Sequence, residues 1–167
     1  MQNFPLVSVI CLSYNHEAYV VEALNSVINQ TYPNIELLIA DDCSSDNSIG
    51  VIKDWVKNHP EVHFSSNEKN LGNTKTFNQL AKIAKGEFII DLAADDLLVP
   101  NCIEKQVTTF QNSKYKNLGI VYGNLIEIDK NGNFLNNYYN KEDRPESGDI
   151  YKMVIGRTTK ICSVSSM

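Results

Sequence analysis

Two stretches decide the fold of this chain: IELLIADD, residues 35–42, and EFIIDLAADD, residues 87–96. Each is a short apolar run typical of a buried strand, and each leads directly into a pair of aspartates. In an open α/β sheet, ligands bind beyond the carboxyl ends of the strands. Carboxylates at that edge can hold a divalent cation together with the phosphate groups it carries. The two stretches therefore predict a metal–nucleotide site at Asp41-Asp42 and Asp95-Asp96.

Strands and helices alternate around these stretches. Further strands are predicted at residues 7–12 and 62–64. Helices are predicted where apolar residues recur at helical spacing: over 18–30, after 44–46, over 77–84 and from Pro100 onward. Gly86 is expected to be a helix C-cap. This order predicts an α/β fold, with a mostly parallel central sheet flanked by helices, in a single domain spanning residues 1–167.

The pattern changes after Asn117. Residues 118–122 and 125–129 read as strands, and Asn131-Gly132 is a strong signal for an antiparallel hairpin. Residues 136–148 are polar and predict a loop. A short helix near 149–155 and a last strand near Ile161 complete the expected order.

The bulk composition is that of an ordinary soluble protein. The 167 residues are 43% hydrophobic and 21% charged, with a net charge of −5 and no basic stripe, so no nucleic-acid partner is expected. The N-terminal residues lack the basic-then-apolar pattern of a signal peptide, and no apolar run of the sequence approaches membrane-spanning length. We therefore expect a cytoplasmic protein, with peripheral association at the inner face of the membrane left open. The cysteines are too widely spaced for a zinc site or a disulfide framework, and Cys11 is expected to be a buried, reduced thiol.

Six short motifs, in the right order, resemble those of the family 2 glycosyltransferases, whose nucleotide-sugar-binding fold is called GT-A. They are PLVSVI with SYN (5–15), NQTYPNIE (29–36), DDCSSD (41–46, similar to the family's DDGSTD), NLG (70–72), KGEFI (85–89), and Asp95-Asp96 with Pro100. The resemblance covers most of the chain. It implies inverting transfer of a sugar from a UDP- or dTDP-sugar to a glycan or lipid-linked acceptor, in bacterial-type polysaccharide synthesis.

The resemblance also implies roles for single residues. Asp95 matches the last acid of the family's Asp-x-Asp motif and is expected to bind Mg²⁺ or Mn²⁺, with Asp96 as its neighbour. The alternative is that this pair caps a helix ahead of Pro100. Asp41 matches the aspartate that reads the base or ribose. Further contacts to the nucleotide are expected from Ser13, Tyr14, Asn15, Asp42, Gly72, Asn78 and Ala94.

Several of these residues have a structural alternative. Tyr14 would stack on the base or pack in the core. Asn15 could be a helix N-cap, and Asp42 could cap the helix that follows Ser45. The turn at 70–72 could offer N–H groups to the diphosphate or be an ordinary turn. The histidines show no metal-ligand spacing, and surface or capping roles are expected for His16, His59 and His63.

The chain departs from the family pattern at two places. Ala93-Ala94 stand before Asp95-Asp96 where the family commonly has DSDD, so the first acid of Asp-x-Asp is missing. Asp91 would lie within its strand and cannot replace that acid. Phe77 precedes Asn78 where many members carry Arg, which removes one possible diphosphate contact.

The general base of the transfer is, by the same resemblance, an acid downstream of a strand that residues 162–167 resemble. Glu142, Asp143 and Asp149 precede that strand and are in the wrong order. We therefore expect this chain to be the N-terminal, donor-binding part of a longer transferase, which binds nucleotide and metal but transfers sugar poorly alone. A non-catalytic nucleotide-binding module is the alternative. A nucleotidyltransferase or a Rossmann dehydrogenase would need a glycine-rich loop after the first strand, and Ser13-Tyr14-Asn15-His16 is not one.

Overall fold

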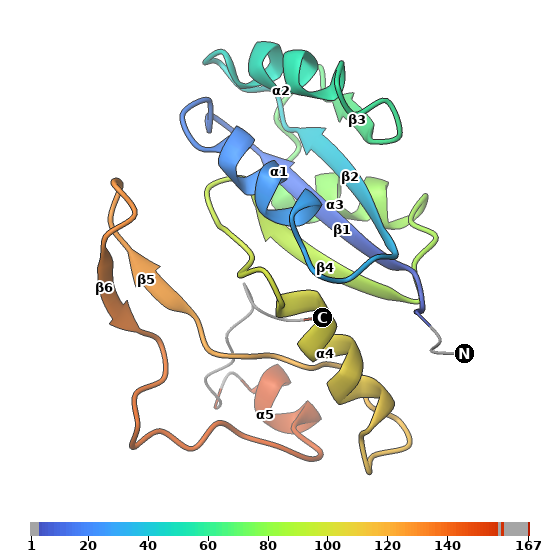
Figure 1. The fold of residues 1–167 in the computed structure, drawn as a ribbon, viewed down its shortest axis with the longest axis vertical. Coiled ribbons are helices and arrows are strands. Elements are labelled where there is room, and N and C mark those ends of the chain that lie inside the picture. Colours follow the sequence, from blue (N-terminus) through green and yellow to red (C-terminus); the bar gives the residue numbers. More distant parts are fainter. Residues whose placement is uncertain (1–3, 157, 159–166) are drawn as a thin grey trace.

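A parallel four-stranded sheet forms the centre of the molecule (Figure 1). The computed structural model describes residues 4–156, 158 and 167. The sheet has the order β3-β2-β1-β4, and every neighbouring pair is parallel. Its strands are β1 (Val7–Ser13), β2 (Ile35–Asp41), β3 (His63–Ser66) and β4 (Phe88–Ala93). The helices are α1 (Val20–Ile28), α2 (Ser48–Val56), α3 (Asn73–Ala81), α4 (Cys102–Gln111) and α5 (Tyr151–Ile155). The predicted α/β architecture is confirmed.

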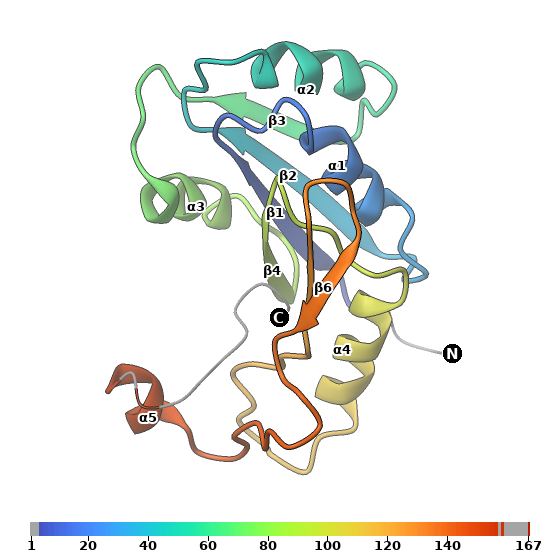
Figure 2. The same cartoon turned by 90° about the vertical axis from the view of Figure 1, so that its left-hand side faces the viewer.

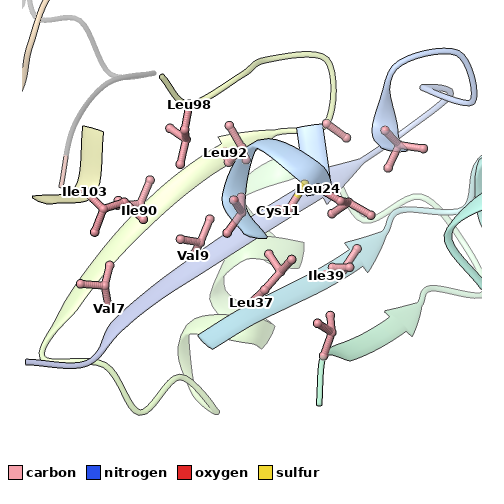
Figure 3. Packing of buried hydrophobic residues seen from close by; sticks show 14 of the residues in the cluster. Val7, Val9, Cys11, Leu24, Leu37, Ile39, Ile90, Leu92, Leu98 and Ile103 are labelled. Carbon is pink, nitrogen blue, oxygen red and sulfur yellow. The ribbon is translucent and has the colours of Figure 1, made fainter. Parts of the chain in front are cut away.

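Helices cover both faces of this sheet. Figure 2 shows α3 on one side and α1 and α4 on the other. Because successive side chains of a strand point to opposite faces, β1 contributes to two separate cores. Val9 and Cys11 pack with Leu24 of α1 on one face, and Ile10 packs with Leu80 of α3 on the other. Figure 3 shows the larger core, where Leu24 lies beside Cys11.

Strand β1 is buried along its whole length, because it has a hydrogen-bonded neighbour on each side and helices on both faces. Cys11 lies at its centre as a free, buried cysteine. Burial raises the pKa of the Cys11 thiol to about 12, and the nearby charges of Asp91 and Asp95 add to the effect. The predicted buried, reduced thiol is confirmed.

The late antiparallel hairpin is also confirmed. Strands β5 (Ile126–Ile128) and β6 (Phe134–Asn137) pair with each other, away from the main sheet (Figure 1). Gly132 occupies the turn with a φ of 80°, a left-handed conformation that glycine adopts without strain. Asp129 closes the turn, because its Oδ1 accepts hydrogen bonds from the backbone N–H groups of Asn131 and Asn133.

The predicted strand at 118–122 is wrong. Tyr122 forms only an isolated bridge, and Val121 exchanges backbone hydrogen bonds with Met167 at 2.8 and 3.1 Å. The run has the composition of a strand, but the described residues offer it no partner along its length. The loop predicted at 136–148 starts too early, since β6 continues to Asn137, and the strand predicted near Ile161 lies outside the described residues.

Gly86 is not a helix C-cap, because α3 ends earlier, at Ala81. A Cβ on Gly86 would lie 2.5 Å from the backbone nitrogen of Ser8 and 2.6 Å from the carbonyl oxygen of Phe88. The Gly86 N–H donates to Ser8 Oγ at 2.8 Å and to Glu36 Oε1 at 3.1 Å. The close approach of this backbone to β1 therefore requires the glycine. Pro100 likewise lies ahead of α4, which begins at Cys102, rather than in its first turn.

Candidate functional site at the carboxyl edge of the sheet

The predicted site residues of β1, β2 and β4 meet at one edge of the sheet. Ser13 and Asp41, the last residues of β1 and β2, are register partners. Ala93 ends β4 opposite Leu12, and the N–H of Ala94 donates to the Leu12 carbonyl at 2.9 Å. Asp95 and Asp96 follow at once. The sheet therefore brings together the two acidic strand ends, as the sequence predicts.

The turns after β1 and β2 are joined by side-chain hydrogen bonds. Asn15 has a φ of 60°, and its Oδ1 accepts from the backbone N–H of Ser45 at 2.8 Å. Its own N–H donates to Ser44 Oγ at 2.9 Å. Asn15 is therefore no N-cap of α1, whose N-cap is Tyr19. Cys43, which stands where the family motif has glycine, takes a left-handed φ of 67°.

Asp41 is fully buried and bonded within its own turn. Its Oδ1 accepts the N–H of Ser44 at 2.7 Å, and its Oδ2 accepts the Ser44 hydroxyl at 2.5 Å. Each carboxylate oxygen can accept a second hydrogen bond, so these contacts leave acceptor capacity for a nucleotide. Tyr14, beside this turn, is 47% exposed, so the core-packing alternative is wrong. Its exposed ring is available for stacking.

Asp42 holds the turn at residues 70–72. Its Oδ1 accepts from the backbone N–H of Leu71 at 2.8 Å and from Asn67 Nδ2 at 2.8 Å. Its Oδ2 accepts from the N–H of Gly72 at 2.8 Å, and Gly72 has a φ of 83°. Asp42 therefore does not cap α2, whose N-cap is Asn47. Both N–H groups of the turn bond to protein, which is the arrangement of the ordinary-turn alternative.

The pKa of Asp42 reflects these contacts. Burial by itself raises the pKa of this carboxyl, but the hydrogen bonds from Leu71, Asn67 and Gly72 lower it by more, so the net pKa lies below the ordinary value. Asn78, the other residue expected near the nucleotide from this region, lies on α3 and is exposed. Phe77, which replaces the family's Arg, packs partly buried against the smaller core.

Asp95 and Asp96 stand where a cation can reach them. The Asp95 side chain is 50% exposed, and its Oδ2 lies 3.7 Å from His16 Nε2. Burial raises the pKa of Asp96, the charge of Asp95 raises it further, and His16 opposes the rise. The helix-cap alternative for this pair is wrong, because the N-cap of α4 is Asn101.

The loop that carries Asp95 is fixed to the end of α1. Gln30 Nε2 donates to the carbonyl of Val99 at 2.8 Å, and its Oε1 accepts from the N–H of Ile103 at 3.2 Å. The N–H of Thr31 donates to the carbonyl of Pro100 at 2.8 Å. The NQTYP motif therefore positions the acidic loop from outside it, a role that its sequence alone does not reveal.

A cavity of about 610 Å³ adjoins the two acids. It lies between the first turn of α1, the Asp95-Asp96 loop and the β5–β6 hairpin. Its other acids are Glu22, Glu127 and Asp129, and its lining also includes Tyr19, Leu97 and Ile126. An acidic cavity with aromatic and aliphatic walls beside the strand ends can receive a hydroxyl-bearing ligand.

The donor set at this edge fits a divalent cation held jointly with a ligand. Asp95 and Asp96 offer hard carboxylate oxygens, and His16 Nε2 lies 3.7 Å from Asp95 Oδ2. Within the same residues, no three His, Cys, Asp or Glu side chains converge closely enough to hold a metal by themselves. A cation here would therefore need oxygens from a bound diphosphate or from water.

Sequence reasoning gave His16 only a surface or capping role. In the structure its side chain is 24% exposed and faces Asp95. The available signal was its position, since it follows β1 in the same turn as Tyr14 and Asn15. His59 stacks on Trp55 with ring centroids 3.9 Å apart, and His63 is exposed on β3.

This chain belongs to glycosyl transferase family 2, whose sequence model matches residues 8–163. It is 34% identical to a chondroitin synthase of Escherichia coli over 84% of this chain and 20% of that protein. It is 30% identical to Staphylococcus aureus TarS, solved with UDP-GlcNAc, over 64% of this chain and 31% of that one, with a TM-score of 0.58.

A mannosyltransferase from Pyrobaculum calidifontis, solved with GDP-Man and Mn²⁺, shares the fold. Its TM-score is 0.64 at 23% identity, over 72% of this chain and 36% of that one. The match thus spans 20% of the chondroitin synthase, 31% of the solved TarS chain and 36% of the mannosyltransferase chain. Among the described residues, every helix is too short or too polar to cross a membrane.

Proposed function

We propose that this chain binds the nucleotide-sugar donor of a family 2 glycosyltransferase, a UDP- or dTDP-sugar, for inverting transfer to a glycan or lipid-linked acceptor in polysaccharide synthesis. The observation that carries the proposal is the meeting of Asp41 and Asp95 at one edge of one parallel sheet, in a chain that matches this family over residues 8–163. The relatives solved with UDP-GlcNAc and with GDP-Man support a nucleotide-sugar ligand.

Each part of the edge has a proposed task. Asp41 accepts a hydrogen bond from the base or ribose, and the exposed ring of Tyr14 stacks on the base. Ser13, Asn15 and the Ala94 backbone shape the floor between them.

Asp95, with Asp96 beside it, holds Mg²⁺ or Mn²⁺ against the diphosphate. When bound, this cation neutralises the negative charge that develops on the departing nucleoside diphosphate. The relative solved with Mn²⁺ supports a metal of this kind.

The acceptor is proposed to approach through the cavity beside Asp95 and Asp96. In an inverting transfer the acceptor hydroxyl attacks the sugar carbon from the face opposite the leaving group and loses its proton to a base. No residue of this chain is proposed as that base. The cavity's role is to bring a hydroxyl group next to the donor.

Calorimetric titration with UDP, dTDP and GDP, with and without Mn²⁺, tests the proposal. We expect UDP or dTDP to bind in the presence of Mn²⁺, and Asp95→Asn to weaken that binding by at least about tenfold, as losses at metal sites commonly do. Asp91→Asn is the matched control, since Asp91 lies on β4 within the sheet and should leave the affinity unchanged. Binding that ignores both Mn²⁺ and Asp95→Asn would remove the metal role, and absence of nucleotide binding would remove the proposed function.

A further inference from the structure

The acidic motif of this chain lacks one acid, and His16 lies where a replacement ligand is needed. Ala93 stands at the position of the missing acid, at the end of β4. The imidazole of His16 approaches the remaining acid from the neighbouring strand, with Nε2 at 3.7 Å from Asp95 Oδ2. Two atoms at this separation are too far apart for a hydrogen bond. They are close enough to be ligands of one cation.

Among the described residues, the ring of His16 has no hydrogen bond that would explain its position. Its Nδ1 is buried without a partner among the described residues. Buried polar groups in proteins are normally hydrogen-bonded, so Nδ1 does not hold this ring in place as it would in a purely structural histidine. The backbone holds the residue instead, because the His16 N–H donates to Ser48 Oγ at 2.9 Å and its carbonyl accepts the N–H groups of Tyr19 and Val20 at 3.0 Å.

The charges around His16 favour a cation. Asp95 and Asp96 are adjacent carboxylates, which repel each other when both are ionised. Within the described part of the chain, no lysine or arginine forms an ion pair with either acid. A metal ion would relieve this repulsion, and neutral imidazole is a common metal ligand in proteins.

We propose that His16 is a ligand of the divalent cation, its Nε2 binding together with the Asp95 carboxylate and the donor diphosphate in place of the acid missing at position 93. This inference rests on the proposed function, since it deepens the metal site of that function. The protein ligands of the metal would then come from two strand ends: a nitrogen from the β1–α1 turn and a carboxylate that follows β4. In an unmodified Asp-x-Asp motif, both acids would come from one segment.

Electron spin-echo envelope modulation of bound Mn²⁺ detects a directly coordinated nitrogen and tests the assignment. The whole chain is frozen with UDP and substoichiometric Mn²⁺. We expect ¹⁴N modulation that changes to the ¹⁵N pattern after histidine-selective labelling, is lost in His16→Gln and persists in His63→Gln, the exposed control. The Mn²⁺ affinity of His16→Gln, read from the signal of free Mn²⁺, should fall by at least about tenfold.

The outcomes separate this inference from the function on which it rests. Mn²⁺ binding that depends on Asp95 but shows no histidine modulation would overturn the role of His16 and leave the donor site intact. Mn²⁺ binding that is unchanged in both Asp95→Asn and His16→Gln would overturn the metal assignment as a whole, including His16. UDP binding measured without metal in the same samples reports on the nucleotide site independently.

Discussion

At the scale of single residues, Asp42 carries a charge that is only 6% exposed and is bonded on both oxygens. Three donors, from Leu71, Gly72 and Asn67, point at it and fix the turn that precedes α3. A buried carboxylate with such partners is stabilising only while it is ionised, because protonation removes the charge that the donors were placed to bind.

Asp42→Asn should destabilise the fold at pH 7 by about 1–3 kcal/mol. The NH₂ group of the new amide would replace a carboxylate oxygen that now accepts hydrogen bonds from N–H groups. Because the folded-state pKa of Asp42 is lowered, its contribution is present above the unfolded-state pKa and is lost as the pH falls through the folded-state pKa. The difference between the two proteins should therefore shrink below about pH 4.

Urea unfolding of both proteins between pH 7 and pH 3 measures this difference. Asp54→Asn is the control, because Asp54 is exposed and forms a surface ion pair with Lys57. Its effect should stay within about 0.5 kcal/mol. A gap between wild type and Asp42→Asn that stayed constant over this pH range would contradict the assigned role.

Residue types and strand positions were enough to predict that Asp41 and Asp95 share an edge, because parallel strands deliver their carboxyl ends together. The same reasoning could not show which acid bonds to what. Asp42 meets Leu71 and Gly72 across 29 and 30 residues of chain, a contact set by the docking of two loops. The approach of His16 to Asp95 likewise depends on how the turn after β1 lies beside the loop after β4.

At the scale of elements, the end of α1 and the loop before α4 act as one unit. Gln30 bonds to the loop through both ends of its amide. Gln30→Leu should lower the unfolding free energy by about 1–2 kcal/mol, because it leaves the N–H of Ile103 and the carbonyl of Val99 without their partner. It should also weaken Mn²⁺-dependent UDP binding, since Asp95 is carried by the same loop.

Hydrogen exchange of the Ile103 amide reports the local change, and calorimetry reports the affinity. The matched control is Asn29→Leu, one position earlier, whose exposed side chain makes no hydrogen bond to any described residue. Equal effects of the two substitutions on Ile103 exchange would show that Gln30 does not fix the loop.

The contact between the 85–86 segment and β1 gives a second test at this scale. Gly86→Ala should destabilise the protein by about 1–3 kcal/mol, because the added methyl group meets the backbone of Ser8 and Phe88 rather than a movable side chain. Gly119→Ala is the control, since a methyl group added there would have nothing within 4 Å and the φ of Gly119 is not in the left-handed region. Thermal unfolding should show a lower midpoint for Gly86→Ala alone, and equal midpoints would contradict the close approach.

Strands were predicted correctly where an apolar residue pattern occurred in a segment that also has a neighbouring strand to pair with. Continuous apolar runs identified β1, β2 and β4, and Asn131-Gly132 identified the hairpin. Residues 118–122 have the same apolar character but lack a partner along their length among the described residues, so the pattern alone predicted a strand that does not form there. Gly86 was misplaced because a glycine required by close packing looks, in a sequence, like a glycine that ends a helix.

At the scale of the whole molecule, an acidic protein is proposed to bind an anionic ligand. The chain has 20 acidic and 15 basic side chains, and the charged lining of the cavity beside the strand ends is itself mostly acidic. Repulsion between like charges weakens as salt shortens the screening length from about 30 Å at 0.01 M to about 8 Å at 0.15 M. Without metal, UDP binding should therefore strengthen over this range of salt concentration.

With saturating Mn²⁺, added salt should instead weaken UDP binding. The bound cation attracts the diphosphate, and salt screens this attraction. Uridine, which lacks the phosphates, is the matched ligand and should bind equally at both salt concentrations. Calorimetric or fluorescence titrations of the two ligands, with and without Mn²⁺, give the four salt dependences. If metal-free UDP instead bound more weakly as salt was added, the diphosphate would be meeting basic groups, and the cation would no longer be needed to explain how this acidic edge accepts it.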